Sequence, residues 1–190
     1  MYDTDKELEE LVNTVRSLGQ NPFILSGNSK SDILHAVRHE TDIHHWIFSG
    51  GTQSVIAPEA PQVPLELFDR TDKTILCICY SMESVCVQLG FPIERRRVNK
   101  TGPVNVSVES PYRTHPLFSG LSNPMMVRRN HRFYFRDGAT GIPTRTPVVP
   151  VASYDGELML ALYKNAVLTQ YHPERTKDGR DFLQNWFSLF

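Results

Sequence analysis

The sequence has little of what marks several large classes of protein. No apolar run approaches the roughly 20 residues of a membrane-spanning helix. The 20 lysines and arginines are balanced by 21 aspartates and glutamates, which gives a formal net charge of −1. Among 190 residues there are 3 cysteines, 11 glycines and 13 prolines. These scarcities argue against a membrane protein, a nucleic-acid binder, a disulfide scaffold and a disordered or collagen-like chain.

The cysteines are crowded as well as few. Cys77, Cys79 and Cys86 lie close together in one apolar segment, and such an odd, clustered set fits reduced thiols better than a disulfide framework. The chain starts Met-Tyr-Asp-Thr-Asp-Lys-Glu, which is acidic where a secretory signal is basic and then apolar. We therefore expect a cytoplasmic protein with neither a membrane nor a nucleic-acid partner.

Hydrophobic residues make up 40% of the chain, enough for one core at this length. We expect a single domain over residues 1–190, in which strands and helices alternate before a stretch of shorter strands. The spacing predicts helices at residues 5–18, 31–39 with Ser31 as N-cap, 63–68, 82–89 and 179–190. Strands are predicted at 21–26, 43–49, 74–79, 104–108, 125–129 and 148–151, with a hairpin of 158–163 and 166–171.

Cys79 ends an almost wholly apolar strand and precedes a helix. A sharp strand-to-helix turn would hold its thiol against the helix N-terminus, where the dipole favours a thiolate. Such a position suits a nucleophile, although cysteines in apolar strands are commonly only structural. We assign that structural role to Cys77 and Cys86 and the nucleophilic role to Cys79.

A base for this thiol is available in Gln170-Tyr-His-Pro-Glu174. His172 and Glu174 are two residues apart, so in an extended segment they point to the same side. A carboxylate hydrogen-bonded to one ring nitrogen fixes the tautomer and leaves the other nitrogen for the thiol. His172 on its own would more often be an ordinary histidine.

An oxyanion site needs only main-chain N–H groups. Tyr80, directly after the nucleophile, and Gly51, in the Ser49-Gly-Gly-Thr52 turn after another strand, are the natural donors. A glycine pair is also common in simple turns. His44 and His45 have no further ligand at metal-binding spacing, so we predict no metal site and no cofactor.

These segments, in this order, resemble the class I glutamine amidotransferase family. Three stretches carry most of the likeness: Ser49-Gly-Gly-Thr-Gln-Ser-Val55 as the glycine-rich turn, Ile75-Leu-Cys-Ile-Cys-Tyr-Ser-Met-Glu83 as the nucleophile elbow, and Gln170-Tyr-His-Pro-Glu174. Thr114-His-Pro-Leu-Phe-Ser-Gly-Leu121 and Arg129-Asn-His-Arg-Phe133 match weaker landmarks of the family. The resemblance extends from about Leu8 to the end of the chain.

The resemblance implies a three-layer, flavodoxin-like α/β fold. Its central sheet would be mostly parallel and flanked by helices, with a small antiparallel extension. The strand that precedes the family's first helix is missing or reduced here to a few residues. By the same likeness, the substrate pocket would be lined by Glu83, Asn130, His131, Arg132 and Phe133. The alternative for Asn130 and His131 is that they only cap a strand end.

Four positions depart from the family pattern. Cys77 and Ser81 replace the glycines on either side of the nucleophile, and both substitutes are small. Thr52 replaces a proline in the oxyanion turn. Glu83 replaces a glutamine that helps hold the substrate's amino-acid end, and its carboxylate could accept from an ammonium group but would repel a carboxylate.

The activity implied is hydrolysis of glutamine to glutamate and ammonia through a γ-glutamyl thioester on Cys79. The ammonia would pass to a separate synthetase partner, since 190 residues leave no room for a synthetase domain. Two alternatives stay open. One is a catalytically impaired regulatory or structural subunit; the other is a related hydrolase of γ-glutamyl or other amide bonds.

Overall fold

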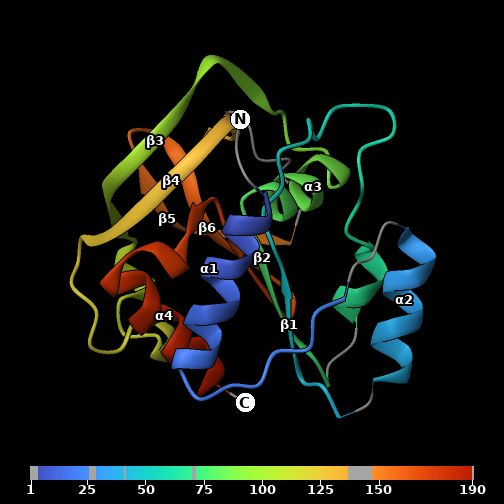
Figure 1. The fold of residues 1–190 in the computed structure, drawn as a ribbon. Helices are drawn as coiled ribbons and strands as arrows, with labels where there is room; N and C mark the ends of the chain where they lie inside the picture. The colour runs from blue at the N-terminus through green and yellow to red at the C-terminus, as the bar shows by residue number, and fades with distance from the viewer. Residues whose placement is uncertain (1–3, 26–28, 41, 70–71, 137–146, 190) are drawn as a thin grey trace.

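The computed structural model describes residues 4–25, 29–40, 42–69, 72–136 and 147–189. One eight-stranded sheet runs through the molecule, with helices on both of its faces (Figure 1). The helices are α1 (Thr4–Ser17), α2 (Lys30–His39), α3 (Tyr80–Gln88) and α4 (Lys177–Phe187), with short 3-10 turns η1 (Leu65–Asp69), η2 (Ser110–Tyr112), η3 (Pro116–Phe118) and η4 (Pro173–Arg175). The strands are β1 (His45–Phe48), β2 (Thr74–Ile78), β3 (Glu94–Val108), β4 (Met125–Tyr134), β5 (Val148–Tyr154), β6 (Glu157–Tyr163), β7 (Ala166–Thr169) and β8 (Tyr171–His172).

The sheet is mixed, in the order β1-β2-β7-β6-β5-β3-β4-β8. β1 pairs parallel with β2, and β2 pairs parallel with β7. The other neighbours pair antiparallel, so the antiparallel part is larger than the small extension that we predicted. Short turns join β5 to β6 and β6 to β7, and such turns make neighbouring strands antiparallel, whereas parallel strands need long crossovers.

Two cores lie on the two faces of the sheet, which confirms the three layers. β2 is buried along its whole length, and its side chains alternate between the cores. Leu76 and Ile78 face the core under α1 and α4, whereas Ile75 and Cys77 face the core under α2 and α3 (Figure 1). Packing on both sides therefore fixes the strand that carries Cys79 at its end.

Local sequence predicted most elements but not all. The strand expected at residues 21–26 is absent over 21–25, which form no regular structure, and residue 26 lies outside the described residues. The helix expected at 63–68 is the 3-10 turn η1. The N-cap of α2 is Ser29, which accepts from the N–H of Asp32, rather than Ser31. No strand precedes α1 in the part of the chain that is described.

β3 and β4 are longer than their apolar segments predicted, because polar and apolar residues alternate along both strands. They form a hairpin that extends beyond the rest of the sheet (Figure 1). The last helix, α4, is fixed by Phe182, Leu183 and Trp186, all fully buried. Among the residues described here, no helix combines the length and apolar character needed to cross a bilayer.

Candidate active site

The turn between β2 and α3 holds Cys79 in an unusual backbone conformation. Its φ is 52° and its ψ is −105°, a region that residues other than glycine rarely adopt. The N–H of Cys79 donates to the carbonyl of Thr169 at 2.7 Å, which ties the turn to the end of β7. Cys79 lies at the N-terminus of α3, as the sequence predicted, with its side chain buried.

β8 and η4 bring His172 and Glu174 together. Nδ1 of His172 lies 2.8 Å from Oε1 of Glu174, and both side chains are buried. This bond leaves Nε2 of His172 for another group, and no described residue hydrogen-bonds to it. The pair therefore has the geometry predicted from its spacing, with one ring nitrogen held and the other available.

Gly50 lies between the two predicted reacting side chains. A Cβ atom at Gly50 would be 3.2 Å from Cε1 of His172 and 3.6 Å from Cβ of Cys79. At Gly51 a Cβ atom would be 3.3 Å from Cγ of Tyr80. The turn after β1 thus passes directly against the cysteine, the histidine and the tyrosine, although they are far apart in the sequence.

The thiol of Cys79 points to a carbonyl rather than to the imidazole. Its Sγ donates to the main-chain oxygen of Asn130 at 3.7 Å, and Nε2 of Gln170 lies 3.9 Å from the sulfur. A hydrogen bond between Cys79 and His172 is not formed in the described arrangement. Catalytic hydrogen bonds are often formed only once the substrate is bound.

The surroundings of Cys79 disfavour its thiolate. Burial raises the pKa of the thiol well above its usual value, and the carboxylates of Glu83 and Glu7 raise it further. The N–H of Tyr80 acts in the opposite direction and lowers the pKa. The main-chain N–H of Tyr80 therefore stabilises the thiolate of Cys79. The carboxylates of Glu83 and Glu7 oppose the ionisation that a nucleophile needs.

Glu83 is the most unusual group near the sulfur. Its side chain is buried and accepts a hydrogen bond from Nε2 of Gln170 at 3.0 Å. Burial raises the pKa of Glu83 to about 7, and the bond from Gln170 only partly opposes the shift. Its charge therefore changes near neutral pH, next to the predicted nucleophile.

A cavity of about 410 Å³ opens beside Cys79. Most of the predicted site residues line it: Gly51, Cys79, Glu83, Asn130, His131, Arg132, Phe133 and His172. The other two predicted residues, Tyr80 and Glu174, lie behind this wall, under Gly51 and His172 respectively. The fold thus gathers these predicted residues from four regions of the sequence around one small polar pocket.

The four residues taken from β4 have different surroundings. Asn130 presents its carbonyl to the thiol and donates from Nδ2 to Glu7 at 3.0 Å. Arg132 is held by the carbonyls of Arg96 and Arg97. Phe133 is buried with Tyr80 in a small apolar cluster. None of them acts only as a cap at the end of a strand, because β4 continues to Tyr134.

His131 joins the pocket to a buried ionic cluster. Its Nδ1 lies 2.7 Å from the carbonyl of Phe133, and its Nε2 lies 3.7 Å from Oε2 of Glu157. Burial lowers the pKa of His131 to about 4, so it is neutral at pH 7. Glu157 is also buried and forms ion pairs with Arg96 and Arg129. This cluster fixes β4 against β3 and β6 behind the pocket.

Sequence reasoning missed several lining residues. Glu7, from the first turn of α1, reaches the pocket and accepts hydrogen bonds from Asn130 and Arg175. Arg95 and Asn99 of β3 also line the pocket. Gln170 is not part of the lining but lies near the sulfur, and it could have been found because it belongs to the motif that contains His172. Nothing in the local sequence marks Glu7, whose role depends on how α1 packs.

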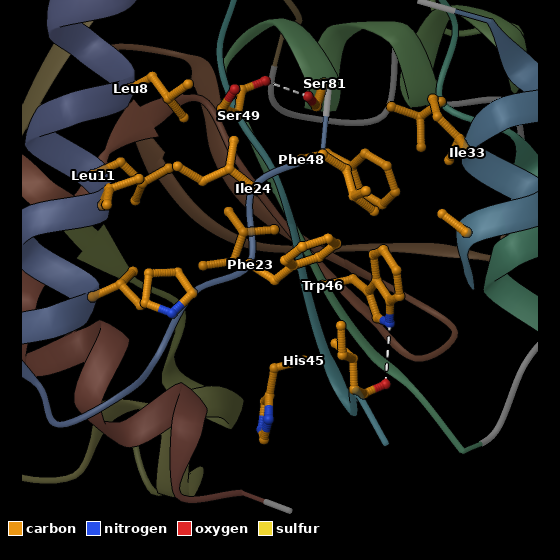
Figure 2. Close-up of a pocket in the computed structure, with 18 of the residues that line it drawn as sticks. Leu8, Leu11, Phe23, Ile24, Ile33, His45, Trp46, Phe48, Ser49 and Ser81 are labelled. Atoms are coloured by element: carbon orange, nitrogen blue, oxygen red, sulfur yellow. Dashed lines mark hydrogen bonds between the residues drawn. The ribbon is translucent and has the colours of Figure 1, made fainter. Parts of the chain in front are cut away.

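Two departures from the family pattern have clear structural consequences. Cys77 is fully buried in the core under α2 and α3. The hydroxyl of Ser81 donates to the carbonyl of Ser49 at 2.5 Å, which links α3 to the glycine turn (Figure 2). All three cysteines are free. Within the described ranges there is no group of three or more side chains arranged to hold a metal ion.

The fold and the pocket define an α/β protein in which a cysteine on a strand-to-helix elbow shares a pocket with a histidine that is paired with a glutamate. The family model for glutamine amidotransferase class-I matches residues 3–188, and the chain belongs to this family.

The relatives point to one branch of that family. The chain is 31% identical over 144 residues to the GMP synthase [glutamine-hydrolyzing] of Acetivibrio thermocellus, covering 74% of this chain and 26% of that protein. It is 34% identical over 137 residues to the same enzyme of Xylella fastidiosa, covering 68% of this chain and 24% of that protein. The chain thus spans about a quarter of the length of these curated relatives.

Among solved structures, a putative GMP synthase subunit from Thermoplasma acidophilum superposes with a TM-score of 0.70 at 21% identity, covering 95% of this chain and 86% of that chain. A glutamine amidotransferase from Thermotoga maritima superposes with a TM-score of 0.50 at 18% identity, covering 75% of this chain and 60% of that one. These similarities confirm the fold.

Proposed function

We propose that this chain hydrolyses glutamine to glutamate and ammonia, with Cys79 as nucleophile, His172 as general base and Glu174 as the carboxylate that orients the imidazole. The observation that carries the proposal is the 2.8 Å contact of His172 with Glu174, directly behind a pocket that contains Cys79. Gly51 and Tyr80 are the proposed oxyanion donors. Glu83, Asn130, His131, Arg132 and Phe133 form the proposed substrate wall.

The first step requires the thiol to turn from the carbonyl of Asn130 to Nε2 of His172. The imidazole takes the thiol proton, and the sulfur attacks the side-chain amide carbon of glutamine. The negative charge that develops on the amide oxygen is stabilised by the main-chain N–H groups of Gly51 and Tyr80. His172 then gives its proton to the departing nitrogen, so that ammonia leaves and a γ-glutamyl thioester forms on Cys79.

The second step releases the product. His172 takes a proton from a water molecule, whose oxygen attacks the thioester carbon. The carbon–sulfur bond breaks, the thiol regains a proton, and glutamate leaves. Glu174, hydrogen-bonded to Nδ1, stabilises the imidazolium in both steps.

We further propose that the ammonia is used by a separate synthetase of the GMP synthase type. Support comes from the relatives, which are named as glutamine-hydrolysing GMP synthases, and from the similar Thermoplasma acidophilum structure, which is described as one subunit of such a synthase. A synthetase on a partner polypeptide is in keeping with that description as a subunit.

The test is a glutaminase assay on Cys79→Ser, with Cys86→Ser as a matched control at another buried cysteine. We expect Cys79→Ser to abolish glutamate release and Cys86→Ser to retain it, with both circular dichroism spectra unchanged. A glutamine-like chloroketone should alkylate Cys79 with loss of chloride, which intact-mass measurement and peptide mapping detect. Equal rates for the wild type and Cys79→Ser would refute the proposal.

A second candidate is a non-catalytic subunit that keeps the fold. It is favoured by the raised pKa of the Cys79 thiol and by the carboxylate of Glu83 beside it. The chloroketone separates the candidates: an adduct on Cys79 supports the enzyme. The non-catalytic role is supported by a thiol that resists both the chloroketone and iodoacetamide. A thiol that reacts only with iodoacetamide indicates a hydrolase of another amide.

A further inference from the structure

Two carboxylates of α1 meet the short turn η4, which follows the proposed base. Glu7 and Glu10 are three positions apart, so they share one side of the helix. Nη2 of Arg175, the last residue of η4, donates to Oε1 of Glu7 at 3.1 Å, and its Nε lies 2.9 Å from Oε2 of Glu10. One helical turn further, the hydroxyl of Thr14 donates to the main-chain carbonyl of Glu174 at 3.4 Å. These contacts bind α1 to η4.

The same guanidinium also faces the proposed catalytic carboxylate. Nε of Arg175 is 3.8 Å from Oε1 of Glu174, the oxygen that lies 2.8 Å from Nδ1 of His172. Since one oxygen faces both groups, a guanidinium that moved closer would compete with the imidazole for it. Nε lies nearer to Glu10, and Nη2 is bonded to Glu7. The α1 carboxylates therefore hold this charge away from Glu174.

On its other side Glu7 reaches the proposed nucleophile through Asn130. Oε1 of Glu7 accepts from Nδ2 of Asn130 at 3.0 Å, and the main-chain oxygen of Asn130 accepts from Sγ of Cys79 at 3.7 Å. Glu7 also lines the Cys79 pocket, and its carboxylate is one of the charges that raise the pKa of the thiol. The Arg175 guanidinium lies against that carboxylate, so it offsets the effect of Glu7 on the sulfur.

These contacts form one chain from the nucleophile to the base, although the two side chains do not hydrogen-bond to each other in the described arrangement. In order, its members are Cys79, Asn130, Glu7, Arg175, Glu174 and His172. The side chains of Glu7 and Arg175 are each 16% exposed, so salt screens their ion pair less than a pair at the surface. One arginine thus has contacts toward both halves of the proposed site.

We propose that Arg175 is a positioning residue that serves both halves of the site. It balances the carboxylate that Glu7 places in the Cys79 pocket. Because α1 holds its guanidinium, Oε1 of Glu174 stays available to orient His172. Arg175 does not line the pocket, so it acts through Glu7 and Glu174. The first role concerns the thiol alone, whereas the second rests on the proposed function.

The first test measures alkylation of Cys79 by iodoacetamide at pH 8, using the full chain. Arg175→Gln removes the guanidinium charge and leaves the Glu7 carboxylate uncompensated. We expect the alkylation rate to fall about threefold, equivalent to half a pKa unit of the thiol. Adding Glu7→Gln to Arg175→Gln should restore the wild-type rate, because no carboxylate is then left to balance. Peptide mass mapping confirms that the label is on Cys79.

Rescue by a second substitution separates charge balance from a purely structural role. If Arg175 only held α1 in place, removing Glu7 as well would not repair the loss. Glu9→Gln and Arg180→Gln are the matched controls, since both side chains are exposed and neither forms an ion pair with a described residue. Each should react like the wild type, and Glu9→Gln should restore nothing in Arg175→Gln. Arg175→Lys keeps the charge and should retain most of the wild-type rate.

The second role is tested with Glu10→Gln in the glutaminase assay. The nearer partner of Nε of Arg175 is then neutral, so the guanidinium is free to approach Glu174. We expect kcat to fall about threefold, the effect of one partly exposed ion pair. KM for glutamine should stay unchanged, because Glu10 does not line the pocket. Glu9→Gln should change neither constant.

Several results would overturn the proposal. Equal alkylation rates for Arg175→Gln and the wild type, or no recovery on adding Glu7→Gln, would exclude charge balance. An unchanged kcat in Glu10→Gln would exclude the second role. Should Arg175→Gln fail to fold, Glu7→Gln is compared with the variant that lacks both charges; the retained guanidinium should make the thiol of Glu7→Gln the more reactive.

The alkylation test also separates this proposal from the proposed function. A wild-type chain that releases no glutamate, but whose alkylation rates follow the expected pattern, would refute the glutaminase and support the balance of Glu7 by Arg175. Glutaminase activity that depends on Cys79, together with alkylation rates that ignore Arg175, would support the enzyme and refute the charge balance.

Discussion

Gln170 donates a hydrogen bond to Glu83 at 3.0 Å, from an amide that also lies 3.9 Å from the sulfur of Cys79. One amide therefore connects a carboxyl group that titrates near neutral pH to the proposed nucleophile. The carboxylate form of Glu83 opposes the thiolate, and the protonated form does not. The reactivity of Cys79 should consequently depend on a residue that forms no bond to it.

Glu83→Gln should make Cys79 more reactive at pH 8. Glu83 is ionised there in the wild type, and its removal eliminates the largest electrostatic opposition to the thiolate. We expect the rate of alkylation by iodoacetamide to rise about tenfold, equivalent to one pKa unit. Peptide mass mapping identifies the modified cysteine, and Glu7→Gln should give a smaller increase. A rate that is the same in Glu83→Gln and the wild type would contradict this account.

Glu83 and His131 should act oppositely on stability as the pH changes. The pKa of Glu83 is raised from 4.5 to about 7, so between these values the folded protein keeps a proton that the unfolded chain has lost. The free energy of unfolding therefore falls as the pH rises, by up to about 3 kcal/mol. The pKa of His131 is lowered from 6.5 to about 4, so its contribution rises with pH over that range.

Urea unfolding at pH 5, 6 and 7 separates the two effects. In Glu83→Gln only the effect of His131 remains, and stability should increase from pH 5 to pH 6.5. In His131→Gln only the effect of Glu83 remains, and stability should decrease up to about pH 7. Between pH 5 and 6 the two effects cancel in the wild type, so its free energy of unfolding should change less than that of either variant. Parallel profiles for all three proteins would disprove the assignment.

Glu157→Ala should destabilise the protein by about 3–5 kcal/mol, because it leaves Arg96 and Arg129 without their buried partner. Glu94→Ala is the matched control, since Glu94, at the start of β3, pairs with Arg136 in a more exposed position. It should cause little change. Urea midpoints measure both effects, and equal losses would argue that the buried cluster is no more important than a surface pair.

Gly179→Ala should destabilise α4 and disturb the His172–Glu174 segment. A Cβ atom at Gly179 would lie 2.2 Å from the carbonyl oxygen of Pro173, a backbone atom that cannot easily move. We expect a loss of about 2–3 kcal/mol and reduced glutaminase activity. Arg180→Ala, one residue further along the helix, should leave both unchanged. Thermal unfolding and the glutaminase assay provide the measurements.

The sequence was most informative where local pattern and packing agree. The apolar run of β2 and the periodicity of α1 predicted their structures, because each segment satisfies its own hydrogen bonds or is buried on both faces. Residues 21–26 show the limit of the method. Their pattern suits a strand, but a strand needs a neighbour, and residues 21–25 pair with none of the strands in the described part of the chain. Pairing is a property of the whole fold.

The same holds for the site. The elbow, the glycine turn and the His172–Glu174 pair were each visible as short motifs, and the structure brings them together. Glu7 was not visible, because its place in the pocket follows from the docking of α1 against Arg175 and Asn130. The orientation of the thiol toward Asn130 could not be foreseen either, since a side-chain rotamer depends on every neighbour.

Gly50 lies between the imidazole of His172 and Cβ of Cys79, although it contributes no functional group of its own. The path of the turn after β1 thus limits the space between the proposed base and the proposed nucleophile. Even one added methyl group at Gly50 would push against the ring of His172. Any redesign of this pocket should accordingly keep glycine at position 50, because the backbone there determines how His172 and Cys79 are placed.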